Sequence, residues 1–162
     1  SKTNRSYFEK FYKMRFLGLD LGTRTLGISI SDKMGIVAST YKTIRFEDSN
    51  YASLIPELIE IITKEQIECV VLGLPKNMNN TYGEATQRTM EFKTLLEKNI
   101  TTKIVLQDER LTTVQADNYM IEAGMSRKKR KKKIDSLAAN IILQTYLDST
   151  RGGNYGKWKN DF

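Results

Sequence analysis

The order of the apolar segments is the feature that most constrains how this chain folds. Three such segments, over 15–20, 25–32 and 36–44, follow one another with only short glycine-containing turns between them. Their alternating or β-branched apolar residues are typical of strands. The start of the chain therefore predicts a three-stranded antiparallel meander.

The rest of the chain alternates helical with strand-like segments. Ser53 is a suitable helix N-cap. Thr81 with Glu84, and Thr112 with Gln115, have the spacing of a capping box at a helix start. In chain order we expect a helix from 53, a strand over 68–74, a polar loop, a helix over 81–99, a strand over 103–107, a helix over 112–123 stopped by Gly124, a basic loop, and a helix over 134–147.

Strands that are separated by helices usually lie parallel, connected by right-handed crossovers. The fold class is therefore α/β, with a five-stranded mixed sheet (a three-strand antiparallel meander plus two parallel strands) flanked by helices. One domain should span residues 14–148. We expect residues 1–13 to be an N-terminal extension, and 149–162, with its glycines and asparagines, to be a flexible tail.

Histidine is absent from the chain, and Cys69 is its one cysteine. Serine–histidine–aspartate and cysteine–histidine nucleophiles are thereby excluded, as are zinc sites built from histidines or from four cysteines. Any catalysis must use carboxylates, lysines, hydroxyls or a hard metal such as Mg²⁺. A lone cysteine, no apolar leader and no long apolar segment together predict a cytoplasmic protein without a membrane span.

The positive charge is concentrated in one segment. The formal net charge is +7, and the seven cations of residues 127–133 account for all of it. Such a cluster favours a polyanionic partner, with a merely solvated or localisation-type lysine loop as the alternative. Because seven like charges repel and lack apolar anchors, we expect a mobile loop. The candidates for nucleic-acid binding are Arg24, Lys76, Arg110, Arg127, Lys128, Lys129, Arg130, Lys131, Lys132 and Lys133.

Acidic residues stand where predicted elements end or begin. Asp20 ends the first strand, Asp108 and Glu109 end the fifth, and Asp135 opens the last helix. The carboxyl ends of parallel strands meet at one edge of a sheet, so these acids should converge there. The alternatives are that Asp20 is an ordinary turn aspartate and that Asp135 only favours the positive end of a helix dipole.

Clustered carboxylates in a chain without histidine favour two-metal phosphoryl transfer, with Mg²⁺ or Mn²⁺ as the cofactor. Three close carboxylates repel one another, and a divalent cation allows all of them to stay ionised. The sequence therefore predicts that Asp20, Asp135 and either Glu109 or Asp108 form a catalytic, metal-binding group.

Four separated motifs resemble the YqgF family, which is also called the RuvX family. They are GLDLGTR over 18–24, GLP over 73–75, DERLTT over 108–113, and SRKKR over 126–130 followed by Asp135. The resemblance covers about residues 14–148. It departs from the family at Thr25-Leu26, where Arg-Ile is usual, and at Asn80, where glycine is common.

The resemblance implies a ribonuclease-H-like fold and a metal-dependent endonuclease that processes the 5′ end of pre-16S rRNA in ribosome biogenesis. It implies Asp20, Glu109 and Asp135 as catalytic acids and metal ligands, with Asp108 as the alternative to Glu109. We expect pre-rRNA rather than junction DNA as the partner, bound by a monomer or weak homodimer.

Three rival functions differ in what they need. A Holliday-junction resolvase would use a two-fold dimer to match its substrate. A nucleic-acid-binding module of the same fold would not need all three acids. An actin-like ATPase shares the strand–turn pattern at Leu19–Arg24, but it needs two lobes and a longer chain.

Overall fold

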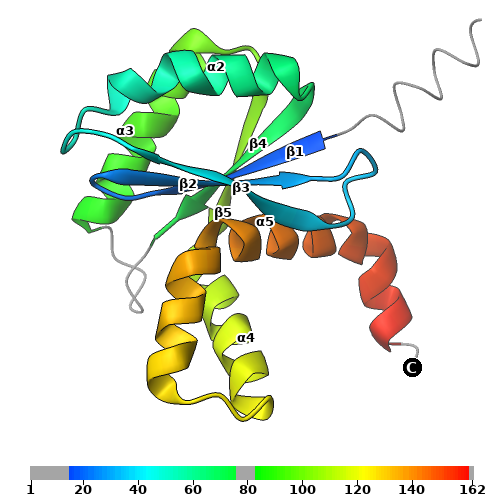
Figure 1. Cartoon of the computed structure of the whole chain (residues 1–162). Coiled ribbons are helices and arrows are strands. Elements are labelled where there is room, and N and C mark those ends of the chain that lie inside the picture. The colour runs from blue at the N-terminus through cyan, green and yellow to red at the C-terminus, as the bar shows by residue number, and fades with distance from the viewer. Residues whose placement is uncertain (1–14, 76–82, 161–162) are drawn as a thin grey trace, which may run out of the picture.

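The computed structural model describes residues 15–75 and 83–160; within them, the side chains of 110–116, 135 and 151–160 are not described. A five-stranded sheet forms the centre, in the order β3-β2-β1-β4-β5 (Figure 1). The strands are β1 (Arg15–Leu21), β2 (Thr25–Ser31), β3 (Ala38–Arg45), β4 (Ile67–Leu74) and β5 (Lys103–Asp108). Strands β1, β2 and β3 pair antiparallel, whereas β4 and β5 add in parallel, which confirms the predicted mixed sheet.

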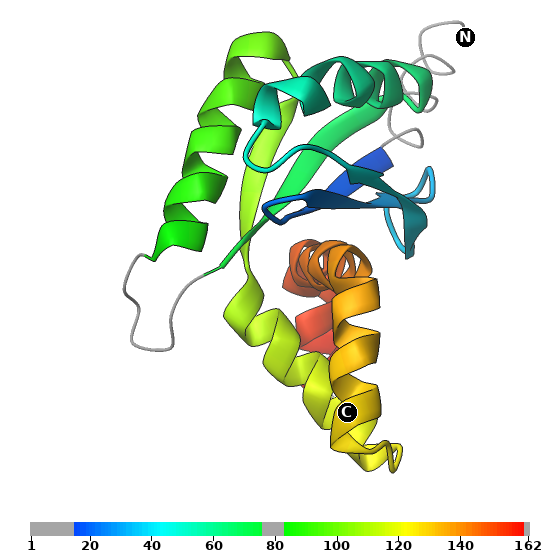
Figure 2. The same ribbon diagram turned by 60° about the vertical axis from the view of Figure 1, so that its left-hand side comes forward.

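Helices cover both faces of the sheet (Figures 1 and 2). One face carries α2 (Ile55–Lys64), which follows the short 3-10 helix η1 (Tyr51–Leu54), and α3 (Glu84–Asn99). The other face carries the middle of α5 (Arg127–Asn160), whereas α4 (Glu109–Glu122) extends away from the sheet. None of the helices in the described ranges has both the length and the apolar content to cross a membrane.

Because side chains alternate between the two faces of a strand, residues of β1 pack into two separate cores. Leu17, Leu19 and Leu21 are buried in the larger core, with the apolar residues of α2 and α3. Phe16 packs instead against the smaller core on the α5 side, which includes Val71, Ile142 and Leu143. Because side chains alternate between faces, Gly18 and Asp20 belong to the α5 side.

Small residues on that side allow α5 to approach the sheet closely. A Cβ at Gly18 would lie 2.8 Å from Leu143 Cβ and 3.0 Å from the Ala139 carbonyl oxygen, and it would overlap Ser29 Oγ. Ser29, which is fully buried, donates its hydroxyl to that same carbonyl oxygen at 2.7 Å. Further along α5, the Gln144 side chain donates to the Ile36 carbonyl and accepts from the Ala38 N–H, both at 2.9 Å. The sheet therefore fixes the position of α5.

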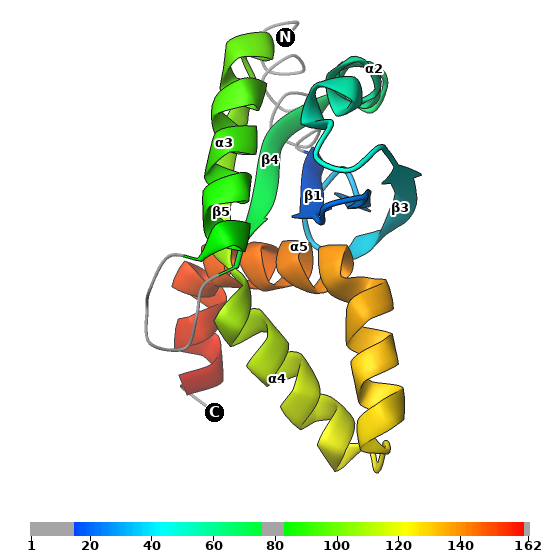
Figure 3. The same ribbon diagram turned by 90° about the vertical axis from the view of Figure 1, so that its left-hand side faces the viewer.

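The segment between α4 and α5 is a tight helical hairpin (Figure 3). Gly124 has a φ of +79°, and the Gly124 and Met125 N–H groups donate to the Ile121 and Met120 carbonyls. These two bonds form a Schellman motif, which ends α4. Ser126 then caps α5, because its hydroxyl accepts from the Lys129 N–H at 3.3 Å. Gly124 stops the helix as predicted, but the predicted basic loop is wrong, because residues 127–133 form the first two turns of α5.

Several predicted helix boundaries are also wrong. The Ser53 hydroxyl donates to the Asn50 carbonyl within η1, and α2 begins at Ile55 with Pro56 in its first turn. Helix α3 begins at Glu84 after Gly83, whereas Thr81 lies outside the described residues. Helix α4 begins at Glu109 rather than 112, and α5 continues to Asn160, where we expected a loose tail. The domain boundaries remain predictions.

Candidate active site

Asp20 lies near the carboxyl end of the central strand β1. Its neighbour across the antiparallel pair is Gly27 of β2, at which a Cβ would lie 3.7 Å from Asp20 Cβ and 3.6 Å from Ala139 Cβ. The buried leucines on either side of Asp20 point into the larger core, so the carboxylate points toward α5. Asp20 is therefore part of the interface between sheet and helix and not an ordinary turn residue.

Glu109 is the first residue of α4, directly after β5. Its side chain lies over the end of β4: a Cβ at Gly73 would be only 2.5 Å from Glu109 Oε1. The same Cβ would be 2.5 Å from Ile142 Cδ1 of α5. Gly73 therefore provides the space that the glutamate occupies between the sheet and α5.

The two carboxyl groups are hydrogen-bonded to each other, and this contact changes the acidity of Glu109. Burial, the charge of Asp20 and the hydrogen bond to Asp20 together raise the pKa of Glu109 from 4.5 to about 8, with burial as the largest cause. The charge of Asp108 adds a smaller effect. Two carboxyl groups in contact raise each other's pKa in this way, because each disfavours the ionised form of the other.

The structure distinguishes the two adjacent acids of the DER motif. Asp108 is the last residue of β5 and pairs in register with Leu74 of β4. Glu109 makes the hydrogen bond to Asp20. Geometry therefore favours Glu109 over Asp108 as the partner of Asp20.

Asp135 lies inside α5 and does not open a helix as we predicted. It is the ninth residue of α5, which begins at Arg127. The helix dipole acts mainly within the first turn, so it does not account for an aspartate at this position. Position 135 lies one helical turn before Ala139, the residue that faces Gly18 and Gly27. The side chain of Asp135 lies outside the described part of the structure.

A polar pocket of about 130 Å³ opens beside Asp20. It lies between the β2–β3 hairpin and α5, and the sequence analysis did not predict it. Its polar lining consists of Asp20, Thr25, Thr40, Lys42, Thr43, Ser136 and Asn140. Lys42 is paired with Glu57 of α2 at 2.5 Å, so the hydroxyl and amide groups dominate the part of the pocket nearest Asp20. The sequence does not reveal this pocket, because the pocket depends on which residues of β2 and β3 face α5.

The predicted nucleic-acid-binding residues lie in two places. Arg24, in the turn after β1, is largely exposed and has a long contact of 3.9 Å to Asp48. Lys76 and the side chain of Arg110 lie outside the described part of the structure. The remaining seven are the cations of α5, at the end of the helical hairpin.

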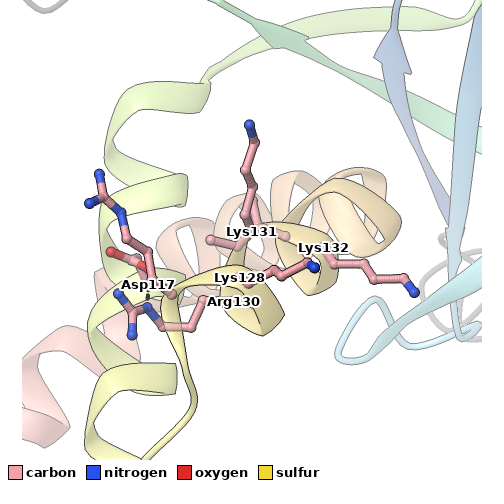
Figure 4. A pocket seen from close by; sticks show the side chains of 7 residues that line it. Asp117, Lys128, Arg130, Lys131 and Lys132 are labelled. Carbon is pink, nitrogen blue, oxygen red and sulfur yellow. Dashed lines mark hydrogen bonds and ion pairs between the residues drawn. The ribbon is translucent and has the colours of Figure 1, made fainter.

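Five of these seven cations line a pocket on one side of the helix. A pocket of about 760 Å³ lies between α4 and the first turns of α5. Its lining is Asp117, Arg127, Lys128, Arg130, Lys131, Lys132 and Ile134 (Figure 4). Lys129 and Lys133 do not contribute to it. The basic segment is thus a shaped surface rather than a diffuse charged loop.

The donor chemistry at the acid pair suits a hard divalent cation. Carboxylate oxygens are the preferred ligands of Mg²⁺ and Mn²⁺, and a divalent cation would allow both Asp20 and Glu109 to stay ionised. Among the side chains that the structure describes, no group of three or more acids or cysteines is placed to hold a metal ion. The described residues thus supply two of the three predicted ligands.

Comparison with known proteins identifies the family. Residues 14–149 match a family model described as "RuvX: Holliday junction resolvase". This chain belongs to the RuvX family. A RuvX relative from Geobacillus sp. (strain WCH70) is 45% identical over 136 residues, which make up 84% of this chain and 99% of that protein. The resemblance that the motifs predicted is confirmed.

Two further RuvX relatives are equally similar. A protein of Clostridium botulinum (strain Hall) is 47% identical over 136 residues, covering 84% of this chain and 98% of its own length. A protein of Listeria innocua serovar 6a is 46% identical over 137 residues, covering 85% and 99%. All three relatives carry the name "Putative pre-16S rRNA nuclease".

Solved structures confirm the predicted fold. RuvC of Thermus thermophilus in complex with a Holliday junction substrate matches with a TM-score of 0.60 at 13% identity, covering 86% of this chain and 96% of that one. A second Thermus thermophilus RuvC structure matches with a TM-score of 0.55 at 13% identity, covering 86% and 97%. The RuvX chain therefore has the ribonuclease-H-like fold of RuvC, and at this identity the likeness concerns the fold alone.

Proposed function

We propose that this RuvX protein is a metal-dependent nuclease that hydrolyses phosphodiester bonds of nucleic acid. The observation that carries the proposal is the hydrogen-bonded pair of Asp20 and Glu109 at the carboxyl edge of the sheet. Two partly buried acids in contact are unfavourable for folding, because each raises the free energy of the other's ionised form. Their meeting at the edge where ligands bind in parallel sheets supports a catalytic role.

Asp20 and Glu109 would hold Mg²⁺ or Mn²⁺, with Asp135 as the third acid. Bound divalent ions in such a site lower the pKa of a water nucleophile and stabilise the leaving oxygen of a phosphodiester. The chain itself positions the two acids: Gly73 leaves space for Glu109, and the strand pairing of β1 with β2 holds Asp20 at the edge of the sheet. Asp108 remains the alternative ligand, with its charge already acting on Glu109.

We assign RNA as the substrate, and specifically the 5′ end of pre-16S rRNA. The names of three relatives at 45 to 47% identity support this assignment. The basic surface of α5 would bind the phosphate backbone, which carries no sequence information, and Arg24, Lys76 and Arg110 would add phosphate contacts. We also propose that the protein acts in the cytoplasm, as a monomer or weak homodimer.

Cleavage of four-way DNA junctions is the second candidate, because the family description names that activity. Junction resolution needs two active sites related by a two-fold axis, and therefore a dimer. Solution mass at working concentration separates a monomer from such a dimer. A stable dimer would favour the junction over pre-rRNA.

The decisive experiment offers both substrates to the same protein. An RNA that spans the 5′ precursor and the mature end of 16S rRNA, and a four-way DNA junction, are incubated with Mg²⁺, Mn²⁺ or EDTA. We expect metal-dependent cleavage of the RNA and none by Asp20→Asn. Cleavage of the junction alone would overturn the assigned substrate. Metal-independent cleavage, or full activity of Asp20→Asn, would overturn the nuclease mechanism.

A further inference from the structure

The first two turns of α5 carry cations on two opposite sides of one helix. With 3.6 residues per turn, positions 128, 131 and 132 lie on one side, and positions 129 and 133 lie on the other. The pocket between α4 and α5 has this same division: Lys128, Lys131 and Lys132 line it, whereas Lys129 and Lys133 do not. Three lysines of this segment therefore face the pocket, and two do not.

The two arginines of this segment also differ from each other. Arg130 is bound within the hairpin: its Nε donates to Asp117 Oδ1 at 3.0 Å and its Nη1 donates to the Met125 carbonyl at 2.7 Å. Its side chain is only 18% exposed. Arg130 therefore holds α4 and α5 together, and Asp117 neutralises it.

The remaining groove cations have no such partner. Within the described residues, neither Arg127 nor Lys128, Lys131 or Lys132 makes an ion pair with an acidic side chain. All four are exposed and line the same pocket. Lys131 extends in one direction from the helix, whereas Lys128 and Lys132 extend away from α4 (Figure 4). Four cations without an acidic partner among the described side chains, all around one groove, favour an extended polyanion rather than a single small anion.

The hairpin fixes the backbone that carries these cations. Its turn is closed by the two bonds of the Schellman motif at Gly124, by the Ser126 cap and by the Arg130–Asp117 ion pair. A ligand that binds here does not have to order a loop first, and so it avoids that loss of conformational entropy. The groove is thus preorganised.

The two helices that form the groove both meet the sheet at the acid edge. Helix α4 begins there with Glu109, directly after β5. The first turns of α5 run back from the hairpin toward the sheet, and the helix then bends so that its next segment lies across the sheet (Figure 3). On that segment, Ala139 lines the polar pocket beside Asp20. A strand bound between the two helices would therefore have the acid edge at one end of its path.

We propose that the groove between α4 and α5 binds one phosphodiester strand and directs it to the acid pair. Lys128, Lys131 and Lys132 contact its phosphates, with Arg127 at the entrance, and Lys129 and Lys133 take no part. The inference rests on the proposed nuclease function, because it assumes a nucleic-acid substrate. It goes beyond that function by naming which half of the basic segment binds.

The chain offers a matched pair of variants to test this. Lys128→Ala/Lys132→Ala removes two groove cations, and Lys129→Ala/Lys133→Ala removes two outward cations with the same spacing from the same helix. Each is made in an Asp20→Asn background, so that the probe survives. Dissociation constants for a fluorescein-labelled single-stranded RNA of about 20 nucleotides are measured by anisotropy from 50 to 300 mM KCl. Circular dichroism checks that both variants keep their helix content.

We expect the groove pair, and not the outward pair, to weaken binding and flatten its salt dependence. Each phosphate contact adds about 0.7 to the slope of log K against log salt for single strands, so the groove pair should lower that slope by about 1.4. The outward pair should leave it unchanged. Equal losses in both pairs would overturn the groove while leaving a charge-binding nuclease intact.

The failure of the groove is distinguishable from the failure of the function. Unchanged binding in both pairs would overturn a nucleic-acid role for the hairpin, and wild-type cleavage of the RNA in parallel reports on the nuclease itself. If the wild-type protein does not cleave the RNA and neither lysine pair affects binding, both the nuclease function and the groove proposal are overturned. The groove would then have to bind a different polyanion, such as an acidic protein.

Discussion

Two regions of this molecule gather like charges, and they do so under opposite conditions. At the acid edge, Asp20 and Glu109 are pressed together between sheet and helix, and burial and mutual repulsion raise the pKa of Glu109 to about 8. At the basic hairpin, the lysines of α5 are exposed to water. Water screens charges at the hairpin, but little water separates the carboxylates.

The difference shows that the acid edge, and not the basic hairpin, lowers the stability of the fold. The hairpin is compatible with a stable fold, because exposed like charges a few ångströms apart repel by only about 1 kcal/mol in water. The acid pair opposes folding unless a proton or a cation neutralises it. Chemistry should therefore reside at the acid edge, and binding at the hairpin. The following predictions test that division, from the largest expected effect to the smallest.

The stability of the metal-free protein should fall as the pH rises from about 4.5 to 8. Below pH 4.5, Glu109 is protonated in both the folded and the unfolded state. Above pH 4.5, the unfolded chain releases this proton, whereas the folded protein keeps it until about pH 8. The unfolded state is therefore stabilised relative to the folded state as the pH rises. The loss should be roughly 2 to 4 kcal/mol in free energy of unfolding. Urea unfolding across this pH range measures it.

Asp20→Asn should reduce this pH dependence more than Asp108→Asn does, because Asp20 acts more strongly on Glu109. Part of the dependence should survive in both variants, since burial is the largest cause of the raised pKa. Added Mg²⁺ should stabilise the wild-type protein most at high pH. A stability that is flat with pH in the wild-type protein would contradict the buried acid pair.

Gly18→Ala should destabilise the protein by about 1 to 3 kcal/mol, because the new methyl group overpacks the α5 interface. Its Cβ would lie 2.8 Å from Leu143 Cβ and would overlap Ser29 Oγ. Gly27→Ala is the matched control, since its Cβ would make ordinary contacts at 3.6 Å and beyond. Melting temperatures compare the two. An equal effect at both positions would mean that α5 does not lie as close to β1 as described.

Gly124→Ala should destabilise the hairpin by about 1 kcal/mol, because an L-residue is strained at a φ of +79°. No atom lies within 4 Å of the added Cβ, so the backbone conformation is the only cause. Gly124→Asn should have a smaller effect, because asparagine tolerates this region better. Hydrogen exchange of the first amides of α5 reports the loss locally. Unchanged protection in Gly124→Ala would argue against a fixed turn.

Arg130→Ala should have the smallest effect, about 0.5 to 1 kcal/mol, since its ion pair with Asp117 is only partly shielded from water. Lys129→Ala removes the same charge from the same helix but should leave stability unchanged. Thermal unfolding of both variants at low and high salt tests the contribution of the Arg130–Asp117 ion pair. A larger loss in Lys129→Ala would reverse the roles that we assign to the two sides of α5.

The strands were predictable from the sequence because their apolar pattern is strong and their order restricts the topology. The sheet could be assembled from alternation and crossover rules alone, and the convergence of Asp20 with the end of β5 followed from it. The choice between Asp108 and Glu109 could not be made, because it depends on the residue at which strand changes to helix. The structure places that change between them.

The basic segment was mispredicted because repulsion between exposed lysines was given too much weight. Gly124 followed by Ser126 is a helix stop and a helix start separated by one residue, and it predicts a helical hairpin. Lysine and arginine are themselves good helix formers. The local capping signals outweigh a repulsion that water screens. The polar pocket beside Asp20 could not be predicted from the sequence, because it depends on how α5 packs on the sheet.

The central claim is that chemistry and binding are separate, and one measurement tests it most directly. Single-turnover cleavage of the pre-16S rRNA substrate is followed with Mg²⁺ over a range of enzyme concentrations in excess of RNA. For Asp20→Asn we predict a plateau rate lowered at least about 1000-fold, which corresponds to roughly 4 kcal/mol of lost transition-state stabilisation. For Lys128→Ala/Lys132→Ala we predict the wild-type plateau, reached only at higher enzyme concentration. A wild-type plateau in Asp20→Asn would contradict the account.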